Sequence, residues 1–384
     1  MKQAIMTWLN RHKDEMESTF RELHSLAEVS WEEKRTTAYL RKALEGIQVP
    51  NLTFEEHTGI VAEWQGAGMR TTTVAIRADM DALMQHVGGV WKANHSCGHD
   101  AHMTMVFYAL KCLKEIGFRP SGKLIVLFQP AEETGEGARK LLQLGLLDDV
   151  EYLLGIHLRP AKELGFGAAS SAIYHGAAAT LLGKVKGRQS HAARPNEGIN
   201  VIDSLAAIVQ ATNAVQSDPT VPSSCKVTRM SVANTSSNII PDAGEFTIDV
   251  RAQTNDVMDD LLGKLKQAVT MAGAANCAEV ELELGMRTVA AVPNGMMEAI
   301  VGGAIEEILG EDVLASPPVT PGGEDFHFYS HDKPGIRATM IGLGADLVPG
   351  LHHPEMQFQL EALQIGSAIL ANSVVKLFAN GQEM

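Results

Sequence analysis

The 384-residue sequence contains little cysteine, and its cysteines are far apart. The four are Cys97, Cys112, Cys225 and Cys277, and no Cys-x-x-Cys pair occurs. This spacing argues against a disulfide framework and against a dithiol redox centre, and it favours a cytoplasmic location. A lone cysteine is most often a small buried apolar residue, which we expect of the last three.

Long hydrophobic segments and dense basic runs are also missing. No apolar run approaches the ~18 residues of a membrane-spanning helix, and residues 1–22 interleave charged with apolar side chains. That beginning is typical of an amphipathic surface helix and not of a secretory signal. The formal net charge of -14 repels nucleic acid and anionic membranes, so we expect neither as a partner.

The length and two short β-branched runs indicate more than one domain, the first with a parallel sheet. At roughly 150 residues per domain the chain has room for two or three. Residues 72–76 and 123–128 are typical of buried strands, and apolar residues between 103 and 113 follow helical spacing. Asp100 is expected to cap this helix. Strand, helix and strand in this order predict a parallel sheet.

The region 178–286 has a different pattern. Its order of strand, helix, strand, strand, helix and strand is typical of a ferredoxin-like sandwich. The predicted elements are 180–185, 199–215, 225–232, 244–251, 257–271 and 278–284.

The pattern of the first domain returns after this region, with helices at 299–309 and 360–378 and a strand at 338–343. We therefore predict an α/β fold with a mixed sheet and helices on both of its faces, formed by residues 1–177 and 287–384. The ferredoxin-like α+β domain, residues 178–286, is inserted into it.

Metal-preferring side chains gather in Cys97-Gly98-His99-Asp100, just before the predicted helix. Gly98 allows the backbone to turn so that Cys97 and His99 face one point. The positive end of the helix would favour the Cys97 thiolate. Alternatively, Cys97 is a buried apolar residue without a ligand role.

Further candidates follow predicted strands. Glu132 and Glu133 come after the strand at 123–128, where an open α/β sheet carries its chemistry. Adjacent side chains diverge, so one acid can bind metal while the other faces substrate. His157 closes a strand-like run, and His352 lies in a loop of the resumed domain. The alternatives are a solvated acid pair and a structural histidine.

Histidine nitrogen, carboxylate oxygen and thiolate sulfur suit zinc, manganese, cobalt or nickel. The candidates supply the number of ligands that a hydrolase with two metal ions needs. They are Cys97, His99, Glu133, His157 and His352.

Six motifs in order resemble the amidohydrolase branch of the M20 metallopeptidase family, which includes aminoacylase-like, hippurate and auxin-conjugate hydrolases. The resemblance covers nearly the whole chain, and it implies a zinc-exopeptidase-like catalytic domain. The motifs are Arg77-Ala78-Asp79-Met80-Asp81-Ala82-Leu83, Cys97-Gly98-His99-Asp100-Ala101-His102, Phe128-Gln129-Pro130-Ala131-Glu132-Glu133, His191-Ala192-Ala193-Arg194-Pro195, Gly322-Gly323-Glu324-Asp325-Phe326 and His352-His353-Pro354.

The resemblance implies that the five candidates bind two divalent metal ions and that Glu132 is the catalytic base. His191 resembles a residue that reaches the active site of a partner subunit and steadies the oxyanion, and the inserted domain commonly forms a homodimer. Asn238 and Arg251 resemble substrate-contacting positions. Gly323 lies in a loop that faces the substrate, unless this loop is only a turn. Asp79 is expected to orient a ligand imidazole.

One segment departs from the family pattern. Family members usually follow Asp-Ala-Leu with Pro and a longer segment before the Cys motif, whereas residues 84–91 are shorter and lack this Pro. The segment borders the pocket in the family, so the identity of the substrate does not carry over.

The expected function is metal-dependent hydrolysis of the amide bond in an N-acyl amino acid or a similar small amide. The alternative within enzymes is a dipeptidase or carboxypeptidase on the same scaffold. A third possibility is a binding protein that keeps the fold without the catalysis.

Overall fold

The computed structural model describes residues 1–66, 72–234 and 236–380. The chain forms two compact units, each described by itself below. The first contains Met1–Tyr174, Val292–Val319 and Asp325–Met384, and the second contains His175–Ala291 and Thr320–Glu324. The divisions lie within a few residues of the predicted ones, but the sequence prediction placed residues 320–324 in the first domain.

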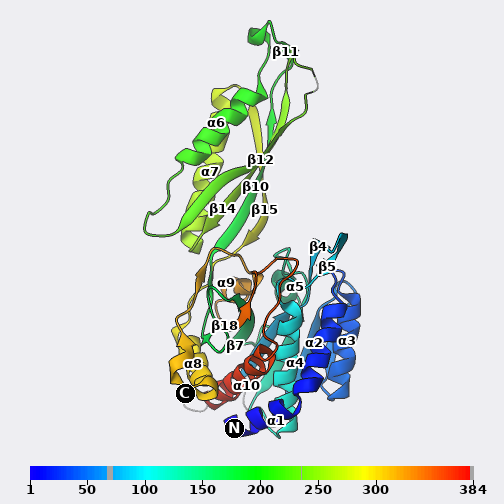
Figure 1. Cartoon of the computed structure of the whole chain (residues 1–384). Helices are drawn as coiled ribbons and strands as arrows, with labels where there is room; N and C mark the ends of the chain where they lie inside the picture. The colour runs from blue at the N-terminus through cyan, green and yellow to red at the C-terminus, as the bar shows by residue number, and fades with distance from the viewer. Residues whose placement is uncertain (67–71, 235, 381–384) are drawn as a thin grey trace. The chain divides into compact units, whose positions relative to one another are not determined.

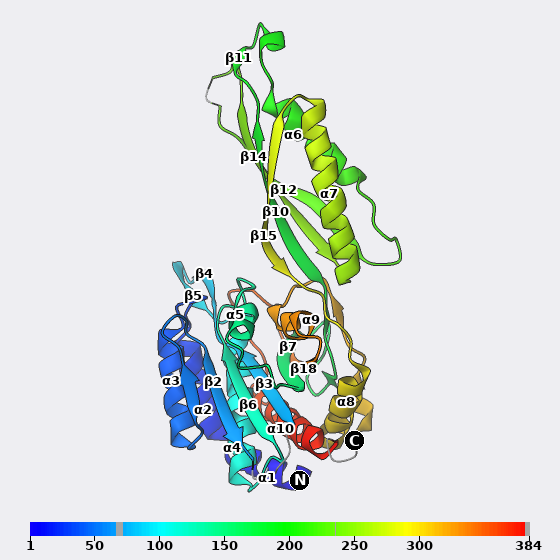
Figure 2. The ribbon, with the colours of Figure 1, turned by 180° about the vertical axis from the view of Figure 1, so that it is seen from behind.

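An eight-stranded mixed sheet organises the first unit (Figures 1 and 2). Its strand order is β1-β2-β6-β3-β7-β18-β8-β16. The central strands β6, β3, β7 and β18 are parallel, while β2 and β8 run antiparallel to their central neighbours. The strands are β1 (Asn51–Thr53), β2 (Ile60–Gln65), β3 (Thr73–Asp79), β6 (Lys123–Gln129), β7 (Tyr152–Pro160), β8 (Ala169–Ser170), β16 (Leu314–Ala315) and β18 (Arg337–Leu347).

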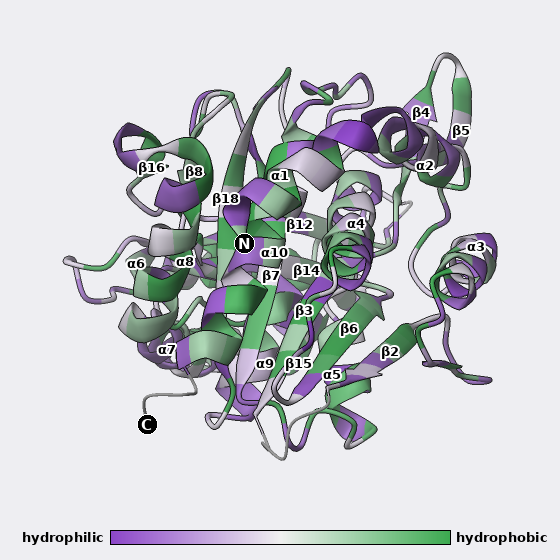
Figure 3. Cartoon of the chain, turned by 90° about the horizontal axis from the view of Figure 1, so that it is seen from below, coloured by the Kyte–Doolittle hydropathy of each residue, from purple (hydrophilic) through white to green (hydrophobic). Residues whose placement is uncertain are grey.

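Helices cover both faces of this sheet, as predicted. Figures 1 and 2, which view the molecule from opposite sides, show α4 and α10 on one face and α5 and α9 on the other. Every residue of β3 is therefore buried, and Figure 3 shows the apolar colouring of the central strands. The helices of this unit are α1 (Lys2–Arg11), α2 (Lys13–Ser25), α3 (Lys34–Gly46), α4 (His99–Glu115), α5 (Gly137–Gln143), α8 (Gly295–Leu309), α9 (Phe328–Asp332) and α10 (Ala362–Asn380).

The N-terminal segment differs from the prediction. It forms two helices, α1 and α2, that meet at His12, and not one. Each has an apolar side: Ile5 and Leu9 of α1 and Met16 and Leu23 of α2 join the main core.

Helix α10 is the one described helix that is long and apolar enough to cross a membrane. However, 72% of its apolar window is buried within the protein, where it packs in the main hydrophobic core. Burial of this kind is typical of a core helix.

The second unit has the predicted βαββαβ order. Its antiparallel sheet has the strand order β12-β14-β10-β15, and Figure 1 shows α6 and α7 on one face. Residues of β14 alternate between buried and more exposed, as expected of a sheet with one covered face. The elements are β10 (Ala177–Lys186), α6 (Val201–Ala214), β12 (Ser223–Val232), β14 (Ala243–Ala252), α7 (Asn255–Ala275) and β15 (Glu279–Thr288).

Each unit also contains a smaller β-pair. In the first unit, β4 (Leu83–Val87) and β5 (Val90–Asn94) form a hairpin. In the second, β11 (Ser190–His191) pairs with β13 (Ile239–Ile240).

Candidate metal centre

The five candidate metal ligands come from one edge of the main sheet. They lie at the start of α4, after β6, within β7 and in the loop after β18. Because β6, β3, β7 and β18 are parallel, the segments that follow them meet at the carboxyl edge of the sheet, where open α/β sheets carry their sites.

Gly98 sets the backbone at the start of α4. It occupies the N-cap position with φ 89°, a left-handed conformation that glycine adopts without steric cost. The sequence pattern assigns the cap to Asp100, but this residue lies in the first turn. Its carboxylate accepts hydrogen bonds from the Ala101 amide at 2.8 Å and from His24 Nδ1 at 2.7 Å, because its side chain turns back toward α2.

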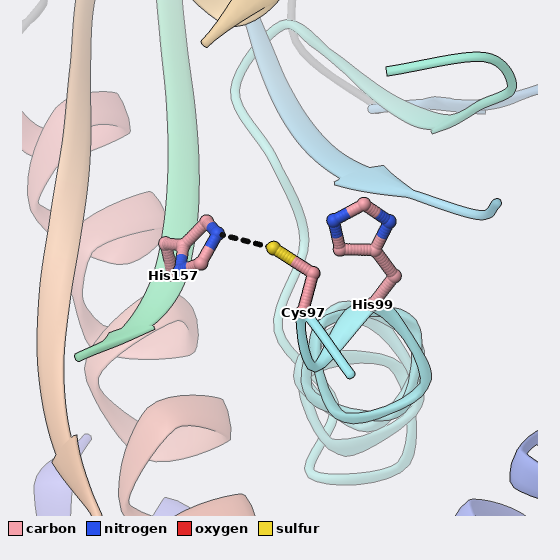
Figure 4. A group of neighbouring side chains, drawn as sticks. All are labelled: Cys97, His99 and His157. Atoms are coloured by element: carbon pink, nitrogen blue, oxygen red, sulfur yellow. Dashed lines mark hydrogen bonds between the residues drawn. The ribbon is translucent and has the colours of Figure 1, made fainter. Parts of the chain in front are cut away.

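Cys97 is the meeting point of two histidines. Its Sγ lies 3.6 Å from His157 Nε2 and 3.3 Å from His352 Nε2. Figure 4 shows Cys97 between His157, from a strand, and His99, at the beginning of a helix. His352 adopts φ 62°, and its amide donates to the Ser96 carbonyl at 2.7 Å, so its loop is tied to the segment that carries Cys97.

His157 presents an unprotonated nitrogen to Cys97. Its Nδ1 lies 2.7 Å from the Leu158 carbonyl oxygen, which only accepts, so Nδ1 carries the hydrogen. Burial lowers the pKa of His157 well below its ordinary value and keeps the ring neutral. The sequence pattern ends the strand before His157, whereas β7 continues to Pro160 because it pairs with β18 along this stretch.

The acid doublet follows Ala131, a residue with φ 54°. Both side chains approach His99: its Nε2 lies 3.9 Å from Glu132 Oε2 and 3.9 Å from Glu133 Oε1. Glu133 Oε1 also lies 3.5 Å from His352 Nε2. The turn at Ala131 thus brings both acids toward the same imidazole, while Glu133 also belongs to the group of Cys97 and His352.

His99 offers a direct test of whether a cation fits. Its Nδ1 donates to the Asp81 carbonyl at 2.9 Å. Burial opposes protonation of the ring, but the charge of Asp79 outweighs burial and raises the pKa of His99 well above its ordinary value, so Nε2 carries a proton that a bound cation would displace. Nε2 is buried and makes no hydrogen bond with any residue that the structure describes. A buried nitrogen of this kind, among carboxylates and a thiol, is what a divalent cation satisfies.

The donor atoms form compact groups, each with all atoms within 4.8 Å of one another. Five such groups occur among the described residues, and four of them share donors around His99 and Cys97. These four are Cys97 with His99 and His157, Cys97 with Glu133 and His352, His99 with Glu132 and Glu133, and Asp79 with His99 and His102.

Electrostatics shows what the cluster lacks without a cation. Burial, together with the charge of Glu133, raises the pKa of the Cys97 thiol well above its ordinary value. Burial and Glu133 therefore outweigh the stabilisation of the thiolate that we expected from the N-terminus of α4. Thiolate character at this position requires a cation, since a coordinated thiol is deprotonated by the metal charge.

Asp79 has a different contact from the expected one. Its Oδ1 accepts from His102 Nδ1 at 2.8 Å, and its Oδ2 accepts from Arg77 at 2.6 Å, while His99 Nε2 is 3.8 Å away. Burial opposes its ionisation, but His99, His102 and Arg77 outweigh burial and hold the pKa of Asp79 well below its ordinary value.

Asp81 contacts the candidate ligands in a way that the sequence interpretation did not predict. Its carbonyl accepts from His99 Nδ1, and its Oδ2 accepts from the Glu133 amide at 3.0 Å. Ser30 donates to the same oxygen at 2.6 Å. Asp81 thereby orients His99 and the acid loop together. Its place two residues after Asp79 in the same motif was the available signal.

The remaining predicted residues belong to the second unit. His191 lies in β11 and Asn238 directly precedes β13, and the Ala192 amide donates to the Asn238 carbonyl at 2.9 Å. Arg251 forms a two-pronged ion pair with Asp249. A Cβ on Gly323 would lie 2.4 Å from Thr288 Oγ1, so no larger residue fits there unless Thr288 moves.

The fold and the cluster define a metal-dependent hydrolase of the α/β class. The family model described as Peptidase family M20/M25/M40 matches residues 75–376, and the chain belongs to this family. The predicted family is thus confirmed, and the protein is an enzyme that hydrolyses amide bonds.

Curated relatives resemble the chain along most of its length. IAA-amino acid hydrolase ILR1-like 2 of Arabidopsis thaliana is 28% identical, over 93% of this chain and 83% of the relative. N-acetyl-L-cysteine deacetylase of Bacillus subtilis is 27% identical, over 94% and 88%. N-acetyldiaminopimelate deacetylase of Streptococcus pneumoniae is 28% identical, over 93% and 97%.

Solved structures share the fold. The YXEP protein of Bacillus subtilis, described as a dinuclear metal binding peptidase from the M20 family, has a TM-score of 0.82 and 25% identity, covering 96% of this chain and 99% of its own. Aminobenzoyl-glutamate utilization protein from Klebsiella pneumoniae has a TM-score of 0.75 at 19% identity, covering 96% and 97%, and shows the fold alone.

Proposed function

We propose that this enzyme removes the acyl group from a small N-acyl amino acid, with Glu132 as the general base beside two divalent metal ions. The observation that carries the proposal is that the five candidate donors and Glu132 form overlapping groups that share Cys97, His99 and Glu133. The names of the relatives, which include deacetylases of acylated amino acids, support this substrate class.

Cys97, His99, Glu133, His157 and His352 would hold the two ions. One thiolate, three imidazoles and one carboxylate suit Zn²⁺, Mn²⁺, Co²⁺ or Ni²⁺. Such ions, when bound, polarise an amide carbonyl and bring the pKa of water toward ~7. Nε2 of both His99 and His157 faces the cluster because Nδ1 of each ring donates to a backbone carbonyl. Metal binding would therefore need no change of tautomer, and His99 would release its Nε2 proton.

Glu132 is placed to move a proton. Its side chain is 9% exposed, so it is shielded from bulk water, yet one oxygen reaches to 3.9 Å from His99 Nε2. In the proposed reaction its carboxylate takes a proton from the attacking water and passes it to the leaving nitrogen. General acid–base assistance of this kind contributes about 10²- to 10⁴-fold.

His191, Asn238 and Arg251 are proposed to act on the substrate, with His191 donating to the oxyanion at a value of roughly 3 kcal/mol. Arg251 pairs with Ala178 at one end of β10, and Lys186 at its other end precedes β11, which carries His191. The strand between them spans roughly 26 Å at ~3.3 Å per residue. No small acyl amino acid reaches both ends of one unit.

This separation supports a homodimer, formed through the second unit, in which His191 and Asn238 act on the substrate of the partner subunit. Arg251 would then hold the carboxylate of a substrate in its own subunit. Gly323 and Arg251 both neighbour Ala178 at the same end of β10. We therefore propose that Gly323 also faces the substrate.

A dipeptidase or carboxypeptidase is the alternative, since Arg251 would bind the carboxylate of a peptide equally well. Comparing N-acetyl amino acids with free dipeptides, with Zn²⁺, Mn²⁺, Co²⁺ and Ni²⁺ added separately, distinguishes the two activities. We also propose a cytoplasmic location, because all four cysteines are free thiols.

The first test is Glu132→Gln, with Glu133→Gln as its matched neighbour. We expect Glu132→Gln to keep its metal and to lose turnover by at least about 100-fold, because it loses the proton acceptor. Glu133→Gln should lower the metal content, because it loses a charged ligand. Metal is measured by mass spectrometry and turnover by release of free amino acid.

The opposite pattern would contradict the assignment. If Glu132→Gln loses metal and Glu133→Gln keeps it, the two roles are exchanged. If the unsubstituted protein binds no transition metal even after reconstitution, the proposed centre is wrong.

A further inference from the structure

The β4–β5 hairpin contains residues 84–91, the segment whose sequence lacks the expected Pro. Gly88 and Gly89, both with positive φ, form its turn, as a tight hairpin turn requires. Figure 1 shows the hairpin standing out from the first unit. It begins after Asp81 and ends before Cys97, so both of its ends join the candidate metal centre.

The two faces of the hairpin differ. One face exposes Met84, His86 and Trp91, of which His86 and Trp91 form a cross-strand edge-to-face pair. Gln85 points to the other face, where its Nε2 donates to the His352 carbonyl at 2.8 Å. The hairpin therefore contacts the backbone of a candidate ligand.

Asn94 completes the contact. Its Nδ2 donates to Gln85 Oε1 at 3.0 Å and to the Pro354 carbonyl at 3.1 Å. Asn94 thus holds the Gln85 amide in the orientation that donates to His352 and also binds the same loop two residues further on. The two side-chain amides and the two loop carbonyls therefore form one connected set of hydrogen bonds.

The loop of His352 needs such support. His352 has φ 62°, a conformation that costs a residue with a side chain roughly 1 kcal/mol or more, and its side chain is 54% exposed. Among the candidate ligands it is the one that lies in a loop far along the chain from the others. Its position beside Cys97 therefore depends on hydrogen bonds to its backbone.

We infer that Gln85 and Asn94 are positioning residues that hold His352 in place to bind a metal ion. The inference rests on the proposed metal centre and concerns residues of the departing segment. The pair acts through its hydrogen bonds to the carbonyls of His352 and Pro354. Metal affinity in this chain would therefore depend on the hairpin.

The test compares Gln85→Leu and Asn94→Leu with the control Met84→Leu, which changes the exposed face of the same strand. Co²⁺ alone is the probe, and its affinity and stoichiometry are measured by equilibrium dialysis of the full chain. We expect Gln85→Leu and Asn94→Leu to weaken binding of one of the two ions about 10-fold or more, as for other partners that orient ligands. Met84→Leu should bind as the unsubstituted chain does.

Two further measurements separate positioning from general stability. The Tm of the metal-free protein should be the same in Gln85→Leu and Met84→Leu, while the rise in Tm on adding Co²⁺ should be smaller in Gln85→Leu. The loss of affinity in the double variant should be smaller than the sum of the two single losses, because the two residues share one set of hydrogen bonds to the loop.

Equal Co²⁺ affinity and stoichiometry in Gln85→Leu and the unsubstituted chain would overturn the inference while leaving the metal centre intact. Additive losses in the double variant would also overturn it. If the unsubstituted chain binds no Co²⁺, the proposed metal centre itself fails.

Discussion

Arg77 is a charged residue among the largest fully buried side chains. Its guanidinium donates to Gln129 at 2.9 Å, to Asp79 at 2.6 Å and to Asp325 at 2.9 Å. It therefore compensates two buried carboxylates and joins β3, the acid-loop strand β6 and the segment before α9. Together with His99 and His102, whose effects on its pKa are larger, Arg77 keeps Asp79 charged beside the candidate metal centre.

Removing this charge should be costly. We expect Arg77→Met to lower the free energy of unfolding by about 3–5 kcal/mol, because two carboxylates then lose their buried partner. Arg21→Met, at a surface ion pair with Glu17, should cost less than about 1 kcal/mol. Denaturant unfolding of the metal-free protein measures both. Similar costs for the two variants would show that the buried network contributes little.

His327 makes stability depend on pH. Burial, with a smaller effect of Arg77, lowers the pKa of His327 from 6.5 to about 3. The unfolded chain therefore takes up a proton below pH 6.5 that the folded protein does not, so stability falls as pH decreases from about 6.5 to about 3. The full stabilisation is present above pH 6.5.

We expect His327→Gln to reduce this dependence by up to about 1.4 kcal/mol per pH unit between pH 6 and 4, since each proton difference contributes that slope. The measurement is the free energy of unfolding of the metal-free protein at several pH values. Parallel pH dependences for the variant and the unsubstituted protein would contradict the assignment.

At the scale of elements, the start of α4 carries two candidate ligands on either side of Gly98. An alanine there would have to adopt φ 89°, and its Cβ would lie 3.1 Å from Leu158 Cδ1. We expect Gly98→Ala to cost roughly 1–2 kcal/mol and to lower metal content, because relief of the strain moves Cys97 relative to His99.

Gly46→Ala is the matched control, since no atom lies within 4 Å of the added Cβ. Metal content by mass spectrometry and unfolding by circular dichroism measure the two effects. Full metal content in Gly98→Ala would show that the backbone turn is not needed for the centre.

Periodicity in the sequence predicted most elements because each pattern is local. The strand at 123–128 became β6, and the six elements of the second unit appear in the predicted order. The ends of the helices and strands were harder to predict, because they depend on contacts with segments distant in sequence. Strand β7 extends past His157 only because β18 lies beside it, and the N-terminal segment divides at His12 to follow the core.

At the scale of the whole molecule, the proposed dimer predicts that two inactive variants restore each other. Mixed subunits of His191→Ala and Glu132→Gln should regain part of the activity, up to about a quarter in a statistical mixture if one intact site forms per mixed dimer. Subunit exchange is verified first with differently tagged chains. Mixed dimers without any recovered activity would contradict sharing of His191 across subunits.

The sequence alone determined which donor atoms are present, the order of the elements that carry them and membership of the family, because these properties are local or are motifs along the chain. Only the tertiary structure decided which atoms meet. It brought Glu132 and Glu133 to the same nitrogen of His99, gave Asp81 the contact expected of Asp79, and linked Gln85 to His352. These contacts depend on strand register and side-chain orientation across distant segments, which no local pattern records.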